Sequence, residues 1–398
     1  MTDKNNIYND LKELVKKINL QYINLEVVNK NTDKFLKIFI ELKKIWNILI
    51  ENKTNFILKK IYKSEQDYNI ILKIISESIF SNIKIITNEI TNIKYIGLLS
   101  FGNIKFYWIC QEFSLENENY VNIEDELYNK VLNMFMISIC LNKFKYSNDD
   151  IERIIIWVPI KKERNFVHKK ITDKNLTKSV ENFEAFTASG VTWGSNPKIT
   201  IITRYEEIEK LLIHELIHNY NIDGSKYHSE FKSIIKKYIK YKNNSNSSNK
   251  NYDYEYSIYE SYTELLSTYL YLLFCNISID NLEPNKLKEK LQGQILIELI
   301  YSFNTIGNLI KLNNYNEYND FVLEKNFIGN ICVYEYYYIK ALMYNNYILE
   351  IGNNINEFKN IYKKIIFMIK KNNIHDDLLM KNIYENCIGQ TNFKYIIH

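Results

Sequence analysis

Glycine, proline and cysteine are all scarce in this chain of 398 residues, which contains 10 Gly, 3 Pro and 5 Cys. Few helix-breaking residues and many long side chains favour a mainly helical fold. The cysteines are odd in number and form no C-x-x-C pair, which argues against a disulfide framework and against a cysteine zinc site. A reducing compartment fits this cysteine content better than secretion does.

A strong net charge and a long apolar run are also missing. The formal net charge of +4 is small for this length and the lysines are spread along the chain, so we expect no specific nucleic-acid binding. The longest apolar runs, 131–141 and 269–279, are too short to span a bilayer, so no membrane partner is expected. The polar N-terminus lacks the apolar segment of a secretory signal. These absences predict a cytoplasmic protein that is not secreted.

The spacing of apolar residues predicts an α+β protein that is mainly helical. We expect a mainly helical region of unknown role over 1–150, a separate core region over 151–280 and a helical region over 281–398. The first region carries one hairpin signal, a Gly-Asn pair between the strand-like runs of 95–110. Helices are predicted at 34–49, 122–141, 205–221, 257–274, 285–311, 328–346 and 355–371. Short strands are predicted at 153–160 and within 186–204, and a polar loop at 243–250.

The stretch 211–220, LLIHELIHNY, carries the clearest chemical signal. His214 and His218 are four residues apart, so on a helix both imidazoles share one face and can reach one ion. Glu215 lies one step round the helix, where it can act as a general base; the pattern is the H-E-x-x-H signature of zinc hydrolases. Leucines and isoleucines surround the three residues, and burying them without a partner would be costly. The alternative interpretation is a pair of core histidines with ordinary hydrogen-bond partners.

A catalytic zinc site needs a third protein ligand. Glu260 is one candidate, with Glu264 one turn further on the same predicted helix, where it could support a ligand histidine. An exposed acidic helix face is the competing interpretation of this pair. His228 is a second candidate, because "HSEF" resembles the element that supplies the third histidine in SprT-like and WLM-type proteases. A histidine six residues after the motif, as in metzincins, is excluded because that position is Gly224.

The expected reaction is hydrolysis of a peptide bond by a zinc-activated water, with Glu215 as the general base. Tyrosines before Glu260 (Tyr252, Tyr254 and Tyr256) are candidate donors to the oxyanion. Asp223 either orients a ligand histidine or forms the Asp-Gly turn that ends the helix, and the turn is the favoured interpretation. The strands ahead of the motif either present an edge to an extended peptide or form an ordinary core hairpin.

"HELIH" followed by "ESYTE" resembles the gluzincin group of zinc metallopeptidases. The resemblance implies a zincin-like core of a small sheet and the H-E-x-x-H helix, with His214, His218 and Glu260 as ligands, Glu215 as base and Glu264 in support. The stretches "SGVTW", "YESYTELLS" and "VYEYYYIKALM" are similar to uncharacterised zincin-like proteins of large nucleocytoplasmic DNA viruses. That resemblance implies a viral protein in the host cytoplasm or the virion.

The leading hypothesis is therefore a zinc metallopeptidase, an endopeptidase acting on protein or peptide substrates. Two alternatives stay open. One is a structural or virion protein with a vestigial zinc site. The other is a SprT-like protease that uses His228 as its third ligand.

Overall fold

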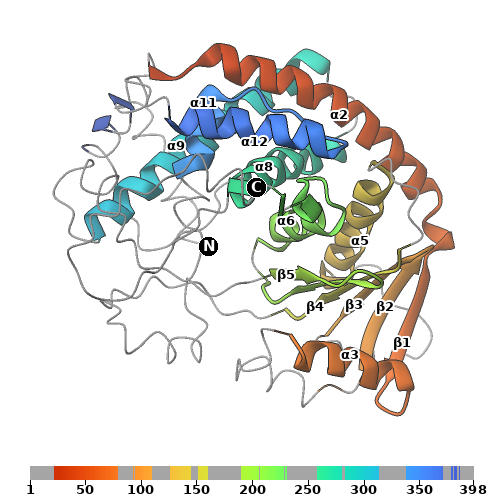
Figure 1. Ribbon diagram of the computed structural model, residues 1–398. Coiled ribbons are helices and arrows are strands. Elements are labelled where there is room, and N and C mark those ends of the chain that lie inside the picture. The colour runs from red at the N-terminus through yellow and green to blue at the C-terminus, as the bar shows by residue number, and fades with distance from the viewer. Residues whose placement is uncertain are drawn as a thin grey trace, which may run out of the picture.

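The computed structural model shows an α+β protein that is mostly helical. Its described residues form eight helices and a six-stranded mixed sheet (Figure 1). The prediction of a mainly helical α+β chain is confirmed. The described residues are 22–78, 93, 95–109, 126–144, 151–159, 190–205, 207–227, 229–230, 258–279, 283–312, 338–370 and a few positions between 378 and 385.

The sheet has the strand order β1-β2-β3-β4-β6-β5. Antiparallel pairs join β1 to β2, β2 to β3 and β5 to β6, while β3, β4 and β6 run parallel. Because β3 pairs with β4, the sheet draws strands from both sides of residue 150, where the sequence predicts a boundary between regions. The strands are β1 (Ile57–Tyr62), β2 (Tyr95–Phe101), β3 (Ile104–Trp108), β4 (Arg153–Trp157), β5 (Gly190–Trp193) and β6 (Lys198–Ile202).

Helices cover both faces of this sheet and build a second layer above it (Figure 1). Each predicted helix is found wherever its residues are described. The helices are α2 (Leu25–Glu51), α3 (Gln66–Ser76), α5 (Glu126–Phe144), α6 (Ile208–Asn219), α8 (Ile258–Ile277), α9 (Pro284–Leu312), α11 (Lys340–Asn346) and α12 (Ile355–Lys370).

Strand alternation explains why the sheet is covered on both faces. On β4, Ile155 and Trp157 belong to the main core, which includes α5 and α6, whereas Ile154 and Ile156 belong to a smaller core that includes α3. Successive strand side chains point to opposite faces, so an all-apolar strand needs packing partners on both. Figure 1 shows α5 and α6 on one side of the sheet and α3 on the other.

The predicted hairpin is present, whereas β1 was not predicted. In the hairpin, Phe101 pairs with Ile104, and Gly102 adopts φ +58°, a backbone conformation that favours glycine in tight turns. β1 lies at the opposite edge of the sheet from β5, and only Ile61 on it is buried. Its lysines give it no clean apolar alternation, so the strand is specified by pairing with β2 rather than by its own pattern.

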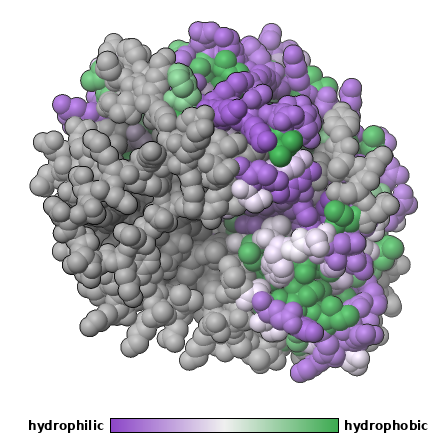
Figure 2. Space-filling model, viewed as in Figure 1, coloured by the Kyte–Doolittle hydropathy of each residue, from purple (hydrophilic) through white to green (hydrophobic). Residues whose placement is uncertain are grey.

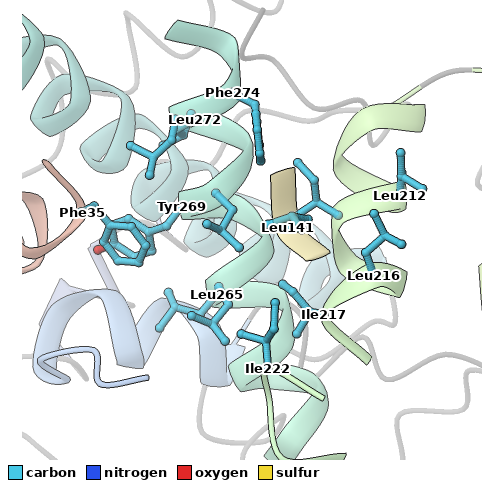
Figure 3. Close-up of a cluster of buried hydrophobic side chains, with 14 of the residues drawn as sticks. Phe35, Leu141, Leu212, Leu216, Ile217, Ile222, Leu265, Tyr269, Leu272 and Phe274 are labelled. Carbon is cyan, nitrogen blue, oxygen red and sulfur yellow. The ribbon is translucent and has the colours of Figure 1, made fainter. Parts of the chain in front are cut away.

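The contact between α6 and α8 forms the centre of the main core (Figure 3). Leu212, Leu216 and Ile217 on α6 are fully buried, as is Leu265 on α8. Burying one such side chain stabilises the fold by about 1.5–3 kcal/mol relative to exposure. Further along α8, Tyr269 stacks on Phe35 of α2 with ring centroids 4.1 Å apart, which ties α2 to the same core. Helices α2, α6 and α8 therefore share the main core.

The face in Figure 2 is hydrophilic over much of α2 and α12, while apolar residues gather between β5 and α3. The smaller core includes partly buried side chains from those two elements, among them Leu72, Ile74, Val191 and Trp193. No described helix combines the length and hydropathy needed to cross a membrane.

Candidate metal centre

Helix α6 carries the H-E-x-x-H motif and is buried nearly all round. It packs on β5 and β6 on one side and on α8 and α5 on the others. The helix ends in a Schellman turn: Asn221 has φ +53°, and the N–H of Ile222 donates to the carbonyl of Ile217 at 2.9 Å. This turn reverses the chain and brings Asp223 back beside the motif.

His214, His218 and Glu260 form a compact cluster of donor atoms. The two imidazole rings lie one helical turn apart, with centroids separated by 5.0 Å. Glu260, in the first turn of α8, places Oε2 at 3.3 Å from Nε2 of His214 and 3.6 Å from Nε2 of His218. Both Nε2 atoms therefore face the same carboxylate oxygen. Among the described residues, this is the one group of three or more such side chains that could hold a metal ion.

The spacing of these atoms fits the donor set of a small divalent cation. Donors about 2.0–2.1 Å from a tetrahedral ion lie roughly 3.3–3.4 Å from one another, which is close to the two histidine–glutamate separations of 3.3 and 3.6 Å. Two imidazoles and one carboxylate also suit zinc better than calcium or magnesium, which prefer oxygen donors. The residues present therefore fit a divalent metal ion that accepts nitrogen as well as oxygen donors.

Each histidine of the cluster has a buried carboxylate on its other ring nitrogen. Nδ1 of His214 lies 3.1 Å from Oε2 of Glu264, and Nδ1 of His218 lies 2.5 Å from Oδ2 of Asp223. An ionised carboxylate can only accept, so each Nδ1 donates its proton. This leaves both Nε2 atoms available as ligands, an arrangement typical of metal-bound histidines.

Asp223 takes both of the roles that the sequence offered as alternatives, the turn and the orientation of a histidine. The turn contact exists, because the backbone N–H of Ser225 donates to Oδ1 at 2.9 Å. The other oxygen, Oδ2, accepts from His218 and from the hydroxyl of Thr263, the latter at 2.9 Å. Asp223 is fully buried. A side chain that only formed a surface turn would be solvated, so Asp223 also orients His218.

Glu264 sits in a buried network of charges behind His214. Its Oε1 accepts from Lys210 and lies 3.4 Å from Nζ of Lys340, which is itself 3.8 Å from Oε2 of Glu298. All four charged side chains are buried, and they come from α6, α8, α9 and α11. Burial tends to raise the pKa of Glu264, but the two lysines outweigh it and hold that pKa well below its usual range. The carboxylate beside His214 is thus kept ionised.

The pKa of Lys210 is also shifted by this buried network. Burial lowers the pKa of Lys210 to about 8, although the neighbouring Glu264 opposes this shift. The lysine lies four residues before His214, on the same face of α6.

Glu215 lies on the side of α6 that faces β5. The hydroxyl of Thr192 donates to its Oε2 at 2.9 Å. A Cβ placed on Gly190 would lie 2.7 Å from Oε1, so the strand backbone approaches this carboxylate as closely as a glycine allows. Burial raises the pKa of Glu215 from its ordinary value, with His214 and His218 opposing that shift. Burial thus makes this carboxylate more ready to take up a proton than an exposed glutamate is.

The cluster itself holds protons when no cation is bound. Burial alone would lower the pKa of His214, but hydrogen bonds to Glu260 and Glu264 raise it to about 9. Burial is likewise outweighed at His218, where Asp223 and Glu260 raise the pKa well above its ordinary value. Burial would raise the pKa of Glu260, but the two imidazoles lower it strongly. The cluster therefore attracts positive charge, which a proton or a metal can supply.

Several predicted residues fall outside the described part of the chain. These are His228 and the three tyrosines Tyr252, Tyr254 and Tyr256. Within the described part, Tyr259 lies against His218 edge-on, with ring centroids 6.0 Å apart.

Sequence reasoning missed Thr192, Lys210, Lys340 and Glu298. The spacing of Lys210 to His214 was available as a signal, since residues four apart share a helix face. Lys340 and Glu298 carry no local signal, because they reach the site only through the packing of α9 and α11.

Comparison of the chain with protein-family models, with curated proteins and with solved structures finds no match. The chemistry of the cluster is therefore argued from its own geometry.

Proposed function

We propose that this chain is a zinc-dependent metallopeptidase with a zincin-like core, in which His214, His218 and Glu260 hold the metal and Glu215 is the general base. One observation carries the proposal: the Nε2 atoms of both histidines converge on the same oxygen of Glu260, at 3.3 and 3.6 Å. The Nδ1 atom of each histidine also forms a hydrogen bond with a buried carboxylate. A merely structural histidine pair would not need three converging donors and two supporting carboxylates.

Zinc, when bound, supplies a Lewis acid and a water nucleophile that is reactive near neutral pH. The protein supplies the remaining parts. Glu215 receives a proton at its carboxylate during attack on the carbonyl and passes it to the leaving amine. Glu264 and Asp223 keep the Nδ1 protons of the two histidines in place.

The position of β5 supports the proposal that the substrate is a peptide. β5 is the edge strand of the sheet, and it packs against α6, the helix that carries the motif. Its inner edge pairs with β6, and no described strand pairs with its outer edge. An extended peptide can hydrogen-bond to such an edge and pass close to Glu215.

The test is a cleavage assay on the zinc-loaded protein with a diverse peptide library. We expect the wild type to cleave members of the library and Glu215→Gln to be slower by about 100-fold or more while retaining zinc. A zinc-loaded wild type that cleaves none of the library, or a Gln variant as fast as wild type, contradicts the proposal. The first of these results favours a non-catalytic protein with a vestigial site.

A second pair of variants separates the two ligand sets. We expect Glu260→Ala to lose zinc and His228→Ala to keep it. The reverse pattern is the result expected of the SprT-like alternative.

A further inference from the structure

A chain of hydrogen bonds leads from the end of α6 through the sheet and back to Glu215. The side-chain amide of Asn219 donates to Oγ1 of Thr200 at 3.0 Å. Oγ1 of Thr200 lies 3.0 Å from Oγ1 of Thr192, and Thr192 donates to Oε2 of Glu215 at 2.9 Å. The two threonines are directly opposite each other in the register of β5 and β6. The helix and the two strands are thus joined by polar contacts at the carboxylate.

We propose that Thr192 is a positioning residue that holds the Glu215 carboxylate in place for proton transfer, with Thr200 and Asn219 orienting its hydroxyl. The inference rests on the proposed function, because it assigns a task to the residue proposed as general base. It also extends the proposal, since Thr192 belongs to the strand beside which a substrate would lie.

The direction of the chain follows from the chemistry of its two ends. An amide N–H₂ only donates and an ionised carboxylate only accepts. Since Asn219 donates to Thr200, the Thr200 hydroxyl can donate to Thr192, and the Thr192 hydroxyl to Glu215. Each hydroxyl then accepts one hydrogen bond from its neighbour in the chain and donates its proton to the next member. A hydroxyl constrained in this way has one preferred orientation.

Thr192 has a second acceptor within reach, the backbone carbonyl of Glu215 at 3.1 Å. That carbonyl lies inside α6, where the helix supplies its own N–H donor from four residues further on. The carboxylate oxygen is nearer, and hydrogen bonds to ionised acceptors are the stronger ones. The hydroxyl proton therefore goes to Oε2.

Gly190 restricts the same carboxylate from its other side. It lies two residues before Thr192, on the same face of β5, and a Cβ there would meet Cγ and Oε1 of Glu215, both at 2.7 Å. One oxygen of Glu215 is thus held by a hydroxyl and the other lies against bare backbone. Rotation of the carboxylate is limited by both contacts.

The experiment compares Thr192→Val with Thr192→Ser. Valine keeps the shape and removes the hydroxyl, whereas serine keeps the hydroxyl. We expect Thr192→Val to lower kcat by about 10- to 100-fold, the range for one hydrogen bond to a charged group, with KM and zinc content unchanged. Thr192→Ser should recover most of the loss. Thr200→Val, which leaves the contact with Glu215 intact, should lower kcat less than Thr192→Val does.

Two results overturn the inference: Thr192→Val with kcat within twofold of wild type, or Thr192→Ser as slow as the valine variant. A second measurement does not depend on activity. In a double-mutant cycle of Thr192→Val and Glu215→Leu, read from urea unfolding of the zinc-loaded protein, we expect the two shifts in midpoint to be non-additive. Additive shifts mean that the side chains do not interact. If the wild type cleaves no peptide but the cycle is non-additive, the proposed function fails while the contact stands.

Discussion

Asp223→Asn is the substitution that tests the structure most sharply, because the sequence alone favours a turn at this position. The change keeps the volume of the side chain and removes its charge. Asp223 accepts from His218 at 2.5 Å, from Thr263 at 2.9 Å and from the N–H of Ser225 at 2.9 Å. An asparagine has only one oxygen, so its amide nitrogen must face at least one of these donors.

The size of the effect follows from these contacts. A buried donor left without an acceptor costs about 1–3 kcal/mol, and loss of a supporting group behind a metal-bound histidine typically lowers metal affinity by about 10- to 100-fold. We therefore expect Asp223→Asn to bind zinc about 10- to 100-fold more weakly, measured by competition with a chromophoric chelator at fixed pH. Asp33→Asn is the matched control, because Asp33 is half exposed and forms an ion pair with Lys288 of α9, which is not a residue of the site. Equal zinc affinity in Asp223→Asn and wild type would refute the reasoning.

Three further predictions concern stability. Leu216→Ala, at a fully buried position on α6 within the main core, should lower the free energy of unfolding by about 2–5 kcal/mol in urea; a loss under 1 kcal/mol would contradict the packing. Lys340→Met removes one of the two lysines beside Glu264 and the lysine beside Glu298, and should cost about 3–5 kcal/mol, part of which Lys340→Met combined with Glu298→Gln should restore; no recovery in the double variant would contradict the network. Because the folded metal-free protein raises the pKa of His214 from 6.5 to about 9, its protonation stabilises the fold fully below pH 6.5, and this stability is lost as the pH rises through 9. Zinc should therefore raise Tm more at pH 8.5 than at pH 6, and an equal rise at both would contradict this linkage.

The spacing of apolar residues was sufficient to predict most of the secondary structure. Helices α2, α6, α8 and α12 and the hairpin of β2 and β3 carry long or distinctive local patterns, and all are present. The edge strand β1 was missed because its residues are mostly exposed and its pairing partner lies more than thirty positions away. A local pattern cannot report a pairing that only the assembled sheet provides.

The candidate site likewise has residues that the sequence predicts and residues whose roles only the fold reveals. The helical repeat placed His214 and His218 on one face, and the four-residue spacing of Glu260 and Glu264 placed these two carboxylates on one face of a second predicted helix. The tasks of Asp223 and Thr192 depend on a chain reversal and on a strand register, respectively. Neither can be deduced from residue spacing. The partnership of Lys340 with Glu264 requires the packing of α11, which no motif encodes.

The central claim is that His214, His218 and Glu260 together bind one zinc ion. Its most direct test is the zinc content of purified wild type and Glu260→Ala, combined with X-ray absorption at the zinc edge. The account predicts one zinc ion per wild-type chain, coordinated by two imidazoles and a carboxylate oxygen, and loss of zinc from Glu260→Ala. A wild type without zinc, or a Glu260→Ala variant with full zinc and an unchanged absorption edge, would contradict it.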